Sequence, residues 1–124
     1  MADVVVKRLG ELETSAGGGF ALAAKTLGVT SFGMNVLRLP PNYAEYPEHD
    51  EGASGQEEVY VLVKGAARLA AGGEEHELTP LSFARVPAGT PRKWIAGGEG
   101  ATIVAVGGVP GSAFGGTSVP ASGT

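Results

Sequence analysis

The chain has 124 residues, of which 43% are hydrophobic, and this fits one globular domain with a single core. Its net charge is −4, and its nine lysines and arginines form no cluster. We therefore expect no nucleic-acid partner, because phosphate binding needs grouped cations. The absence of cysteine excludes disulfides, thiolate metal sites and cysteine nucleophiles. No apolar run approaches the ~20 residues of a membrane helix, and the first residues lack a signal pattern, so we expect a cytoplasmic protein without membrane association.

The elements expected along the chain are mostly short strands separated by turn residues. Residues 1–19 carry one β-branched run and a flexible glycine stretch, and residues 20–28 fit a strand or a helical turn equally well. From residue 31 onward, segments rich in Val, Ile, Phe and Tyr alternate with Gly and Pro. Strands are expected within residues 31–39, 57–65, 67–78 (two strands around a turn at 71–73), 81–89, 91–96 and 101–109.

This spacing predicts an all-β, antiparallel sandwich or barrel in a single domain. The Gly-Gly-Glu-Gly run at 97–100 is expected to be the turn between the last two strands. The C-terminal stretch is rich in Gly, Pro, Ser and Thr and cannot form a core element, although Phe114 offers one anchor. The predicted division is a domain over residues 1–108 and a tail over residues 109–124.

The stretch PEHDEGASGQEEVYVLVKG, residues 47–65, is unusually acidic and leads into the clearest strand. Strand alternation puts Glu58 and Tyr60 on one face, opposite the valines of the same strand. If Glu58 faces the interior, its carboxylate needs a cation or hydrogen-bond donors. His49 and Glu51 are two residues apart and share a face of an extended segment, so with Glu58 they are candidate metal ligands.

The order of these residues resembles the two motifs of the cupin superfamily. The first family motif ends in a glutamate, six residues and a glycine, and here Glu58 and Gly65 follow His49 and Glu51 in that order. The second family motif runs Pro, one residue, Gly, two residues and His, and here residues 87–92 read PAGTPR. The resemblance covers residues 32–108 and implies a cupin-type, jelly-roll-like antiparallel β-barrel.

Metal-binding cupins are similar in using three histidines and one glutamate. Carried over by residue, His49 and Glu58 keep their family positions, Glu51 replaces the second histidine, and Arg92 replaces the third. Glu51 can still ligate a metal, but Arg92 cannot, because its guanidinium stays protonated. Arg92 is therefore expected either to form a salt bridge with a glutamate in place of the metal, or to capture an anionic ligand group.

Two aromatic residues accompany this candidate site. Trp94 lies two residues after Arg92 and shares its strand face, so it either walls a pocket or fills the core. Tyr60, on the face of Glu58, has the same two interpretations. The second histidine of the chain, His76, has acidic neighbours and is expected at the surface.

Three functions are compatible with these residues. The favoured one is a non-catalytic protein that binds a small anionic molecule at Arg92, Tyr60, Trp94 and Glu58, with a degenerate metal site. The alternative is a metal-dependent enzyme of isomerase or oxygenase type, with a weakly held divalent metal at His49, Glu51 and Glu58. The third is a structural remnant that acts through dimer contacts. The resemblance also implies a homodimer. The favoured function needs no cofactor. It is preferred because the fourth ligand position of the family is occupied here by the positively charged Arg92.

Overall fold

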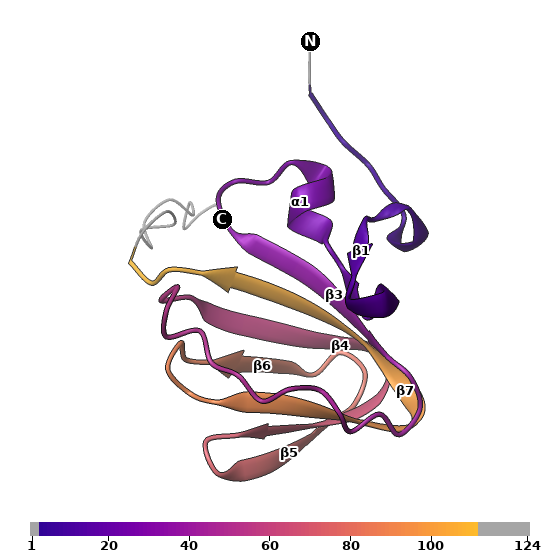
Figure 1. Cartoon of the computed structure of the whole chain (residues 1–124), viewed down its shortest axis with the longest axis vertical. Coiled ribbons are helices and arrows are strands. Elements are labelled where there is room, and N and C mark those ends of the chain that lie inside the picture. The colour runs from indigo at the N-terminus through magenta and orange to yellow at the C-terminus, as the bar shows by residue number, and fades with distance from the viewer. Residues whose placement is uncertain (1–2, 112–124) are drawn as a thin grey trace, which may run out of the picture.

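The structure, a computed structural model, describes residues 3–111 (Figure 1). The predicted C-terminal tail, with Phe114, therefore lies almost entirely outside the described residues. The strands form one antiparallel sheet, and the short helices belong to the N-terminal part of the chain. The elements are η1 (Leu9–Glu11), β1 (Thr14–Ser15), η2 (Ala16–Gly18), β2 (Phe20–Ala21), α1 (Ala23–Leu27), β3 (Gly33–Leu39), β4 (Glu57–Ala71), β5 (Glu74–Leu78), β6 (Phe83–Val86) and β7 (Arg92–Gly108).

The two long strands β4 and β7 organise the sheet. The hydrogen-bonding order is β1-β2-β3-β7-β4-β5, and β6 pairs with β4. The first half of β4, up to Gly65, lies between β6 and the second half of β7. The second half of β4, from Ala67, lies between β5 and the first half of β7. The same pair of strands therefore contributes to two parts of the sheet.

Both long strands bend where these halves meet. The pairing of β4 with β7 shifts register between Gly65 and Ala67, and Gly65 and Gly100 have φ angles of 88° and 74°. A Cβ atom on Gly65 would lie 2.0 Å from the carbonyl oxygen of Gly100. Only glycine fits there, because the left-handed backbone and the close approach both exclude a side chain.

The bend brings the two halves of the sheet face to face around the core. Tyr60 and Trp94 belong to opposite halves and are not paired in the sheet, yet their rings meet edge to face at 5.2 Å. The buried cluster between the halves draws on β3, β4, β5, β6 and β7, and on the chain between β3 and β4. It consists of Leu37, Leu39, Tyr46, Tyr60, Leu62, Ala67, Leu69, Leu78, Val86, Trp94, Ala96, Ala101, Ile103 and Ala105.

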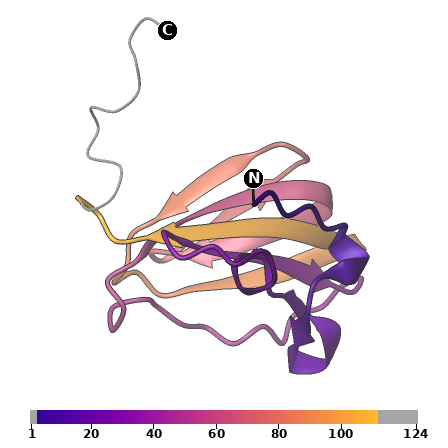
Figure 2. The same ribbon diagram turned by 90° about the horizontal axis from the view of Figure 1, so that it is seen from above.

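Residues 40–56 connect β3 to β4 without forming a strand, and they run along one side of the molecule (Figure 2). Backbone hydrogen bonds nevertheless attach them to the first half of β7. Asn42 N of the connection donates to Gly97 O of β7 at 2.8 Å, and Ala96 N of β7 donates to Tyr43 O of the connection at 2.9 Å. The connection therefore covers the edge of β7, and it closes one side of the interior.

The sequence predicted most strands, with two corrections. The expectation of a turn at residues 97–100 was wrong, because β7 continues through them and Gly100 bends the strand without reversing it. The expectation that the strand beginning at Glu57 ends near Gly65 was also wrong, because β4 runs on to Ala71. The glycine turn before β5 is confirmed.

Several other expectations concern the N-terminal region and the domain limits. Residues 20–28 contain both of the alternatives, a two-residue strand and the short helix α1. β7 ends at Gly108, where the predicted domain ends, but the domain boundary itself stays a prediction. Within residues 3–111, no helix is long and apolar enough to cross a membrane.

Candidate functional site

The connection before β4 places His49 and Glu51 beside the start of β7, with side chains 34% and 25% exposed. His49 and Arg92 form an isolated antiparallel bridge, with His49 N to Arg92 O at 3.0 Å and Arg92 N to His49 O at 2.8 Å. Glu51 N donates to Ala88 O at 2.7 Å. Both residues of the first motif are thus held by the backbone of the second motif, and their side chains reach each other, with His49 Nε2 3.3 Å from Glu51 Oε2.

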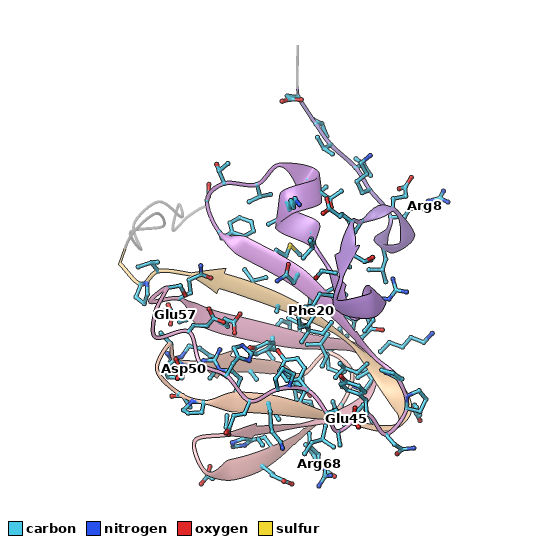
Figure 3. The ribbon with its side chains drawn as sticks, viewed as in Figure 1. Arg8, Phe20, Glu45, Asp50, Glu57 and Arg68 are labelled. Carbon is cyan, nitrogen blue, oxygen red and sulfur yellow. The ribbon has the colours of Figure 1, made fainter. Side chains whose placement is uncertain are left out.

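Strand β4 delivers Glu58 and Tyr60 to the same place. Tyr60 is buried, whereas the neighbouring Val59 is 37% exposed, which confirms the alternation expected from the sequence. The Glu58 side chain is 16% exposed, and its Oε1 accepts a hydrogen bond from the Tyr60 hydroxyl. Figure 3 shows where the chain enters β4, with Asp50 and Glu57 at that end of the sheet.

Arg92 provides the counter-charge from the start of β7. Its side chain is fully buried, and its Nη1 donates to Glu58 Oε1 at 2.5 Å. Its Nε donates to Thr90 O at 2.9 Å, and its Nη2 donates to Pro87 O at 2.6 Å. Of the two roles predicted for Arg92, the structure shows the ion pair, and all three nitrogens of the guanidinium already have protein partners.

Both hydrogen bonds to Glu58 end on the same oxygen, Oε1. Neither bond therefore engages Oε2. The sequence suggested that an arginine here competes with a metal for Glu58. The geometry instead allows Arg92 and Tyr60 to fix one oxygen of the carboxylate while the other remains for a further ligand.

A cavity of about 290 Å³ adjoins these groups. His49, Glu51, Glu58 and Tyr60 line it together with residues of β2, β3, β7 and the connection. The further lining residues are Phe20, Asn35, Leu37, Tyr46, Pro47 and Ala105. Arg92 and Trp94 lie outside this lining, and Trp94 is fully buried with no hydrogen-bond partner for Nε1 among the described residues. The prediction that they contact a ligand stays a prediction.

The three predicted metal ligands do converge. One donor atom from each of His49, Glu51 and Glu58 can be chosen so that all lie within 4.8 Å of one another. Donor atoms that share one divalent ion lie roughly 3 to 4.2 Å apart, given metal–ligand bonds of about 2.1 Å. Small side-chain adjustments would therefore allow a common ion. One imidazole and two carboxylates suit a hard or borderline divalent metal.

Two tyrosines, Tyr46 and Tyr60, also line the cavity. Burial, with the nearby Glu58 carboxylate adding to it, raises the pKa of Tyr46 to about 12. Burial and the hydrogen bond to Glu58 also raise the pKa of Tyr60. Both hydroxyls therefore keep their protons near neutral pH, and that of Tyr60 donates to Glu58.

Sequence reasoning missed Tyr46, whose ring lies 5.7 Å from that of His49. Its position three residues before His49 carries no periodic signal, because the connection is not a strand. Asn35 was also missed, although the alternation of the strand places it on the face of Leu37. The other histidine, His76, lies at the surface as predicted, with a side chain 53% exposed.

No protein-family model matches the sequence, and no curated protein matches it either. Solved structures do match its fold. A cupin protein from Bacteroides fragilis aligns with a TM-score of 0.73 at 16% identity, covering 91% of this chain and 90% of that chain. A protein from Photorhabdus luminescens aligns with a TM-score of 0.67 at 12% identity, covering 89% of this chain and 90% of that chain.

A sugar phosphate isomerase of the cupin superfamily from Silicibacter pomeroyi aligns with a TM-score of 0.61 at 25% identity. That match covers 73% of this chain and 59% of the isomerase. The chain therefore has the all-β cupin fold, as the resemblance of its two motifs implied. At these identities the matches define the fold, and the function has to be argued from the site.

Proposed function

We propose that this chain binds a small anionic molecule in the cavity through a divalent cation held by His49, Glu51 and Glu58. The observation that carries the proposal is the convergence of these three side chains, within 4.8 Å, on one cavity of about 290 Å³. The ion would supply a positive charge to which an oxygen group of the ligand binds.

The charges at the cavity explain why the cation, and not Arg92, is the proposed anchor. The guanidinium of Arg92 is fully buried and already bonded to Glu58, Thr90 O and Pro87 O. The cavity itself is lined by two carboxylates, which repel an anion in the absence of a metal. In this arrangement Arg92 is a positioning residue that holds Glu58, and the Tyr46 hydroxyl is a donor for the ligand.

The experiment is a metal analysis of protein purified without chelator, followed by titration of the chelator-treated protein with Mn²⁺ or Zn²⁺. We expect about one ion per chain, and a loss of at least tenfold in affinity in His49→Ala and in Glu51→Gln. The matched controls are His76→Ala and Glu57→Gln, because His76 is exposed and Glu57 pairs with Arg85 away from the cavity. Metal binding that is absent, or that survives His49→Ala, contradicts the proposal.

A second candidate is a metal-free binding protein in which the Arg92–Glu58 ion pair takes the place of the metal. The observation in its favour is the direct bond of 2.5 Å between Arg92 Nη1 and Glu58 Oε1. Here a small carboxylate such as acetate would bind chelator-treated protein without added metal. In the first proposal the same carboxylate binds only after Mn²⁺ has been added, so one titration separates the two.

An enzymatic role would rest on the same three ligands. The Silicibacter pomeroyi neighbour is described as a sugar phosphate isomerase, and isomerase or oxygenase chemistry remains the alternative for this chain. The predicted homodimer and cytoplasmic location likewise stay predictions, and sedimentation of the purified protein measures the first of them directly.

A further inference from the structure

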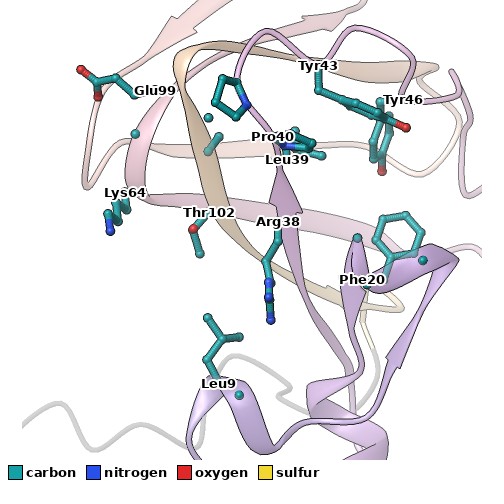
Figure 4. A pocket seen from close by; sticks show the side chains of 18 of the residues that line it. Leu9, Phe20, Arg38, Leu39, Pro40, Tyr43, Tyr46, Lys64, Glu99 and Thr102 are labelled. Carbon is teal, nitrogen blue, oxygen red and sulfur yellow. The ribbon is translucent and has the colours of Figure 1, made fainter.

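A second and larger hollow, of about 880 Å³, lies where the N-terminal segment passes the end of β3 (Figure 4). We call it the N-terminal groove. Residues of η1 and η2 form one wall, and residues at the end of β3 and at the bend of β4 and β7 form the other. It adjoins the central cavity at Phe20, Tyr46 and Pro47, but it shares none of the three predicted metal ligands.

A row of two cations and a hydroxyl crosses this groove. Arg38 of β3 and Lys64 of β4 both pair in register with Thr102 of β7, which lies between them. Figure 4 shows Thr102 between Arg38 and Lys64. Neighbouring strands are about 4.8 Å apart, so the Cα atoms of the two cations are separated by roughly 10 Å. Their long side chains can therefore reach one group placed over Thr102.

The two cations have no protein partner in the part of the chain that the structure describes. Its ion pairs of lysine and arginine engage Lys25, Arg68, Arg85 and Arg92. Within the described residues, Glu99 is the one carboxylate in the lining of the groove, and it forms no ion pair with either cation. The lining thus carries a net positive charge in a chain whose net charge is −4.

The rest of the lining is mostly apolar or aromatic. In Figure 4, Leu9 lies on the wall toward which the Arg38 side chain points, and Pro40 and Tyr43 lie on the opposite wall. A ligand held by the cations would therefore rest an organic group against these side chains. A bare anion would leave this surface unused.

We propose that the N-terminal groove binds a phosphate monoester. Arg38 supplies a planar fork for two phosphate oxygens, Lys64 supplies a compact charge, and the Thr102 hydroxyl donates a further hydrogen bond. A dianion suits this set better than a single carboxylate, because two cations and a hydroxyl offer more donors than one carboxylate uses. The organic part of the monoester lies against Leu9 and Pro40.

The test is a titration of chelator-treated protein with phenyl phosphate and with inorganic phosphate, followed by backbone amide shifts in NMR spectra. Removing the metal keeps the central cavity from binding phosphate through an ion, so this result is independent of the proposed function. We expect shifts around Thr102, and an affinity about tenfold lower in Arg38→Gln and in Lys64→Gln. Glu99→Gln, which removes the carboxylate of the groove, should bind phenyl phosphate more tightly.

Arg68→Gln and Arg85→Gln are the matched controls, because each removes an exposed arginine outside the groove. Both should bind phenyl phosphate as the unmodified chain does. An affinity that is equal in Arg38→Gln and the unmodified chain, or equally reduced in Arg68→Gln, overturns the site. Inorganic phosphate that binds as tightly as phenyl phosphate overturns the role of Leu9 and Pro40.

Discussion

Replacing Arg92 by methionine should destabilise the protein strongly, even though the side-chain volume is nearly kept. The guanidinium is fully buried, and its loss leaves Glu58 without its counter-charge and Thr90 O and Pro87 O without their donor. Removing one partner of a buried ion pair costs about 3 to 5 kcal/mol, chiefly because the other charge stays buried without compensation. We expect this decrease in the free energy of unfolding for Arg92→Met, and a similar one for Glu58→Met.

The double variant decides whether the pair acts as a unit. With both charges removed, no uncompensated charge remains, so Arg92→Met/Glu58→Met should cost less than the two single changes together. We expect a coupling energy of about 2 to 3 kcal/mol. The chain has one tryptophan, the buried Trp94, and its fluorescence reports unfolding in urea.

The chain also offers a matched pair at the surface. Arg68 Nη1 lies 3.0 Å from Glu75 Oε1, with side chains 47% and 53% exposed. The same double-mutant cycle at Arg68 and Glu75 should give a coupling below about 1 kcal/mol, because solvent screens the charges. If the buried pair gives no larger coupling than this surface pair, the burial argument for Arg92 and Glu58 is refuted.

Three further predictions test the fold and the cavity. Gly65→Ala should lower the free energy of unfolding in urea by about 2 to 5 kcal/mol, because both the left-handed backbone and the Gly100 oxygen oppose a Cβ atom. Gly28→Ala, with φ 80° and nothing within 4 Å, should lower it by only about 1 to 2 kcal/mol. Leu62→Ala should cost about 2 to 5 kcal/mol, but Val63→Ala, on the opposite and 46% exposed face, should cost less than about 1 kcal/mol; similar costs would contradict the assignment of faces. The pKa of Tyr46 is raised from 10.0 to about 12. Between these pH values Tyr46 ionises in the unfolded chain but not in the folded one, so the free energy of unfolding should fall by about 1.4 kcal/mol per pH unit. In Tyr46→Phe the free energy of unfolding should fall less steeply over that range.

The pattern of residues was enough to predict one part of the site. Strand alternation put Glu58 and Tyr60 on one face of their strand and Arg92 and Trp94 on one face of theirs, since the side-chain period of a strand is local and does not depend on the rest of the fold. The spacing from Glu58 to Gly65 and the run from Pro87 to Arg92 then indicated the cupin fold. These inferences needed only neighbouring residues or motif order.

The tertiary structure alone decided which groups meet. Glu58 and Arg92 are 34 residues apart, and their contact depends on the bend at Gly65 and Gly100, which the sequence presented as a strand end and a turn. Tyr46 reaches the cavity from a connection with no periodic pattern, so its place depends on how that connection packs against β7. Whether Arg92 faces a ligand or a glutamate was likewise open in the sequence, because both partners are anionic oxygens. The packing of distant strands brings Arg92 into contact with Glu58, since local patterns fix which way a side chain points and packing fixes what it touches.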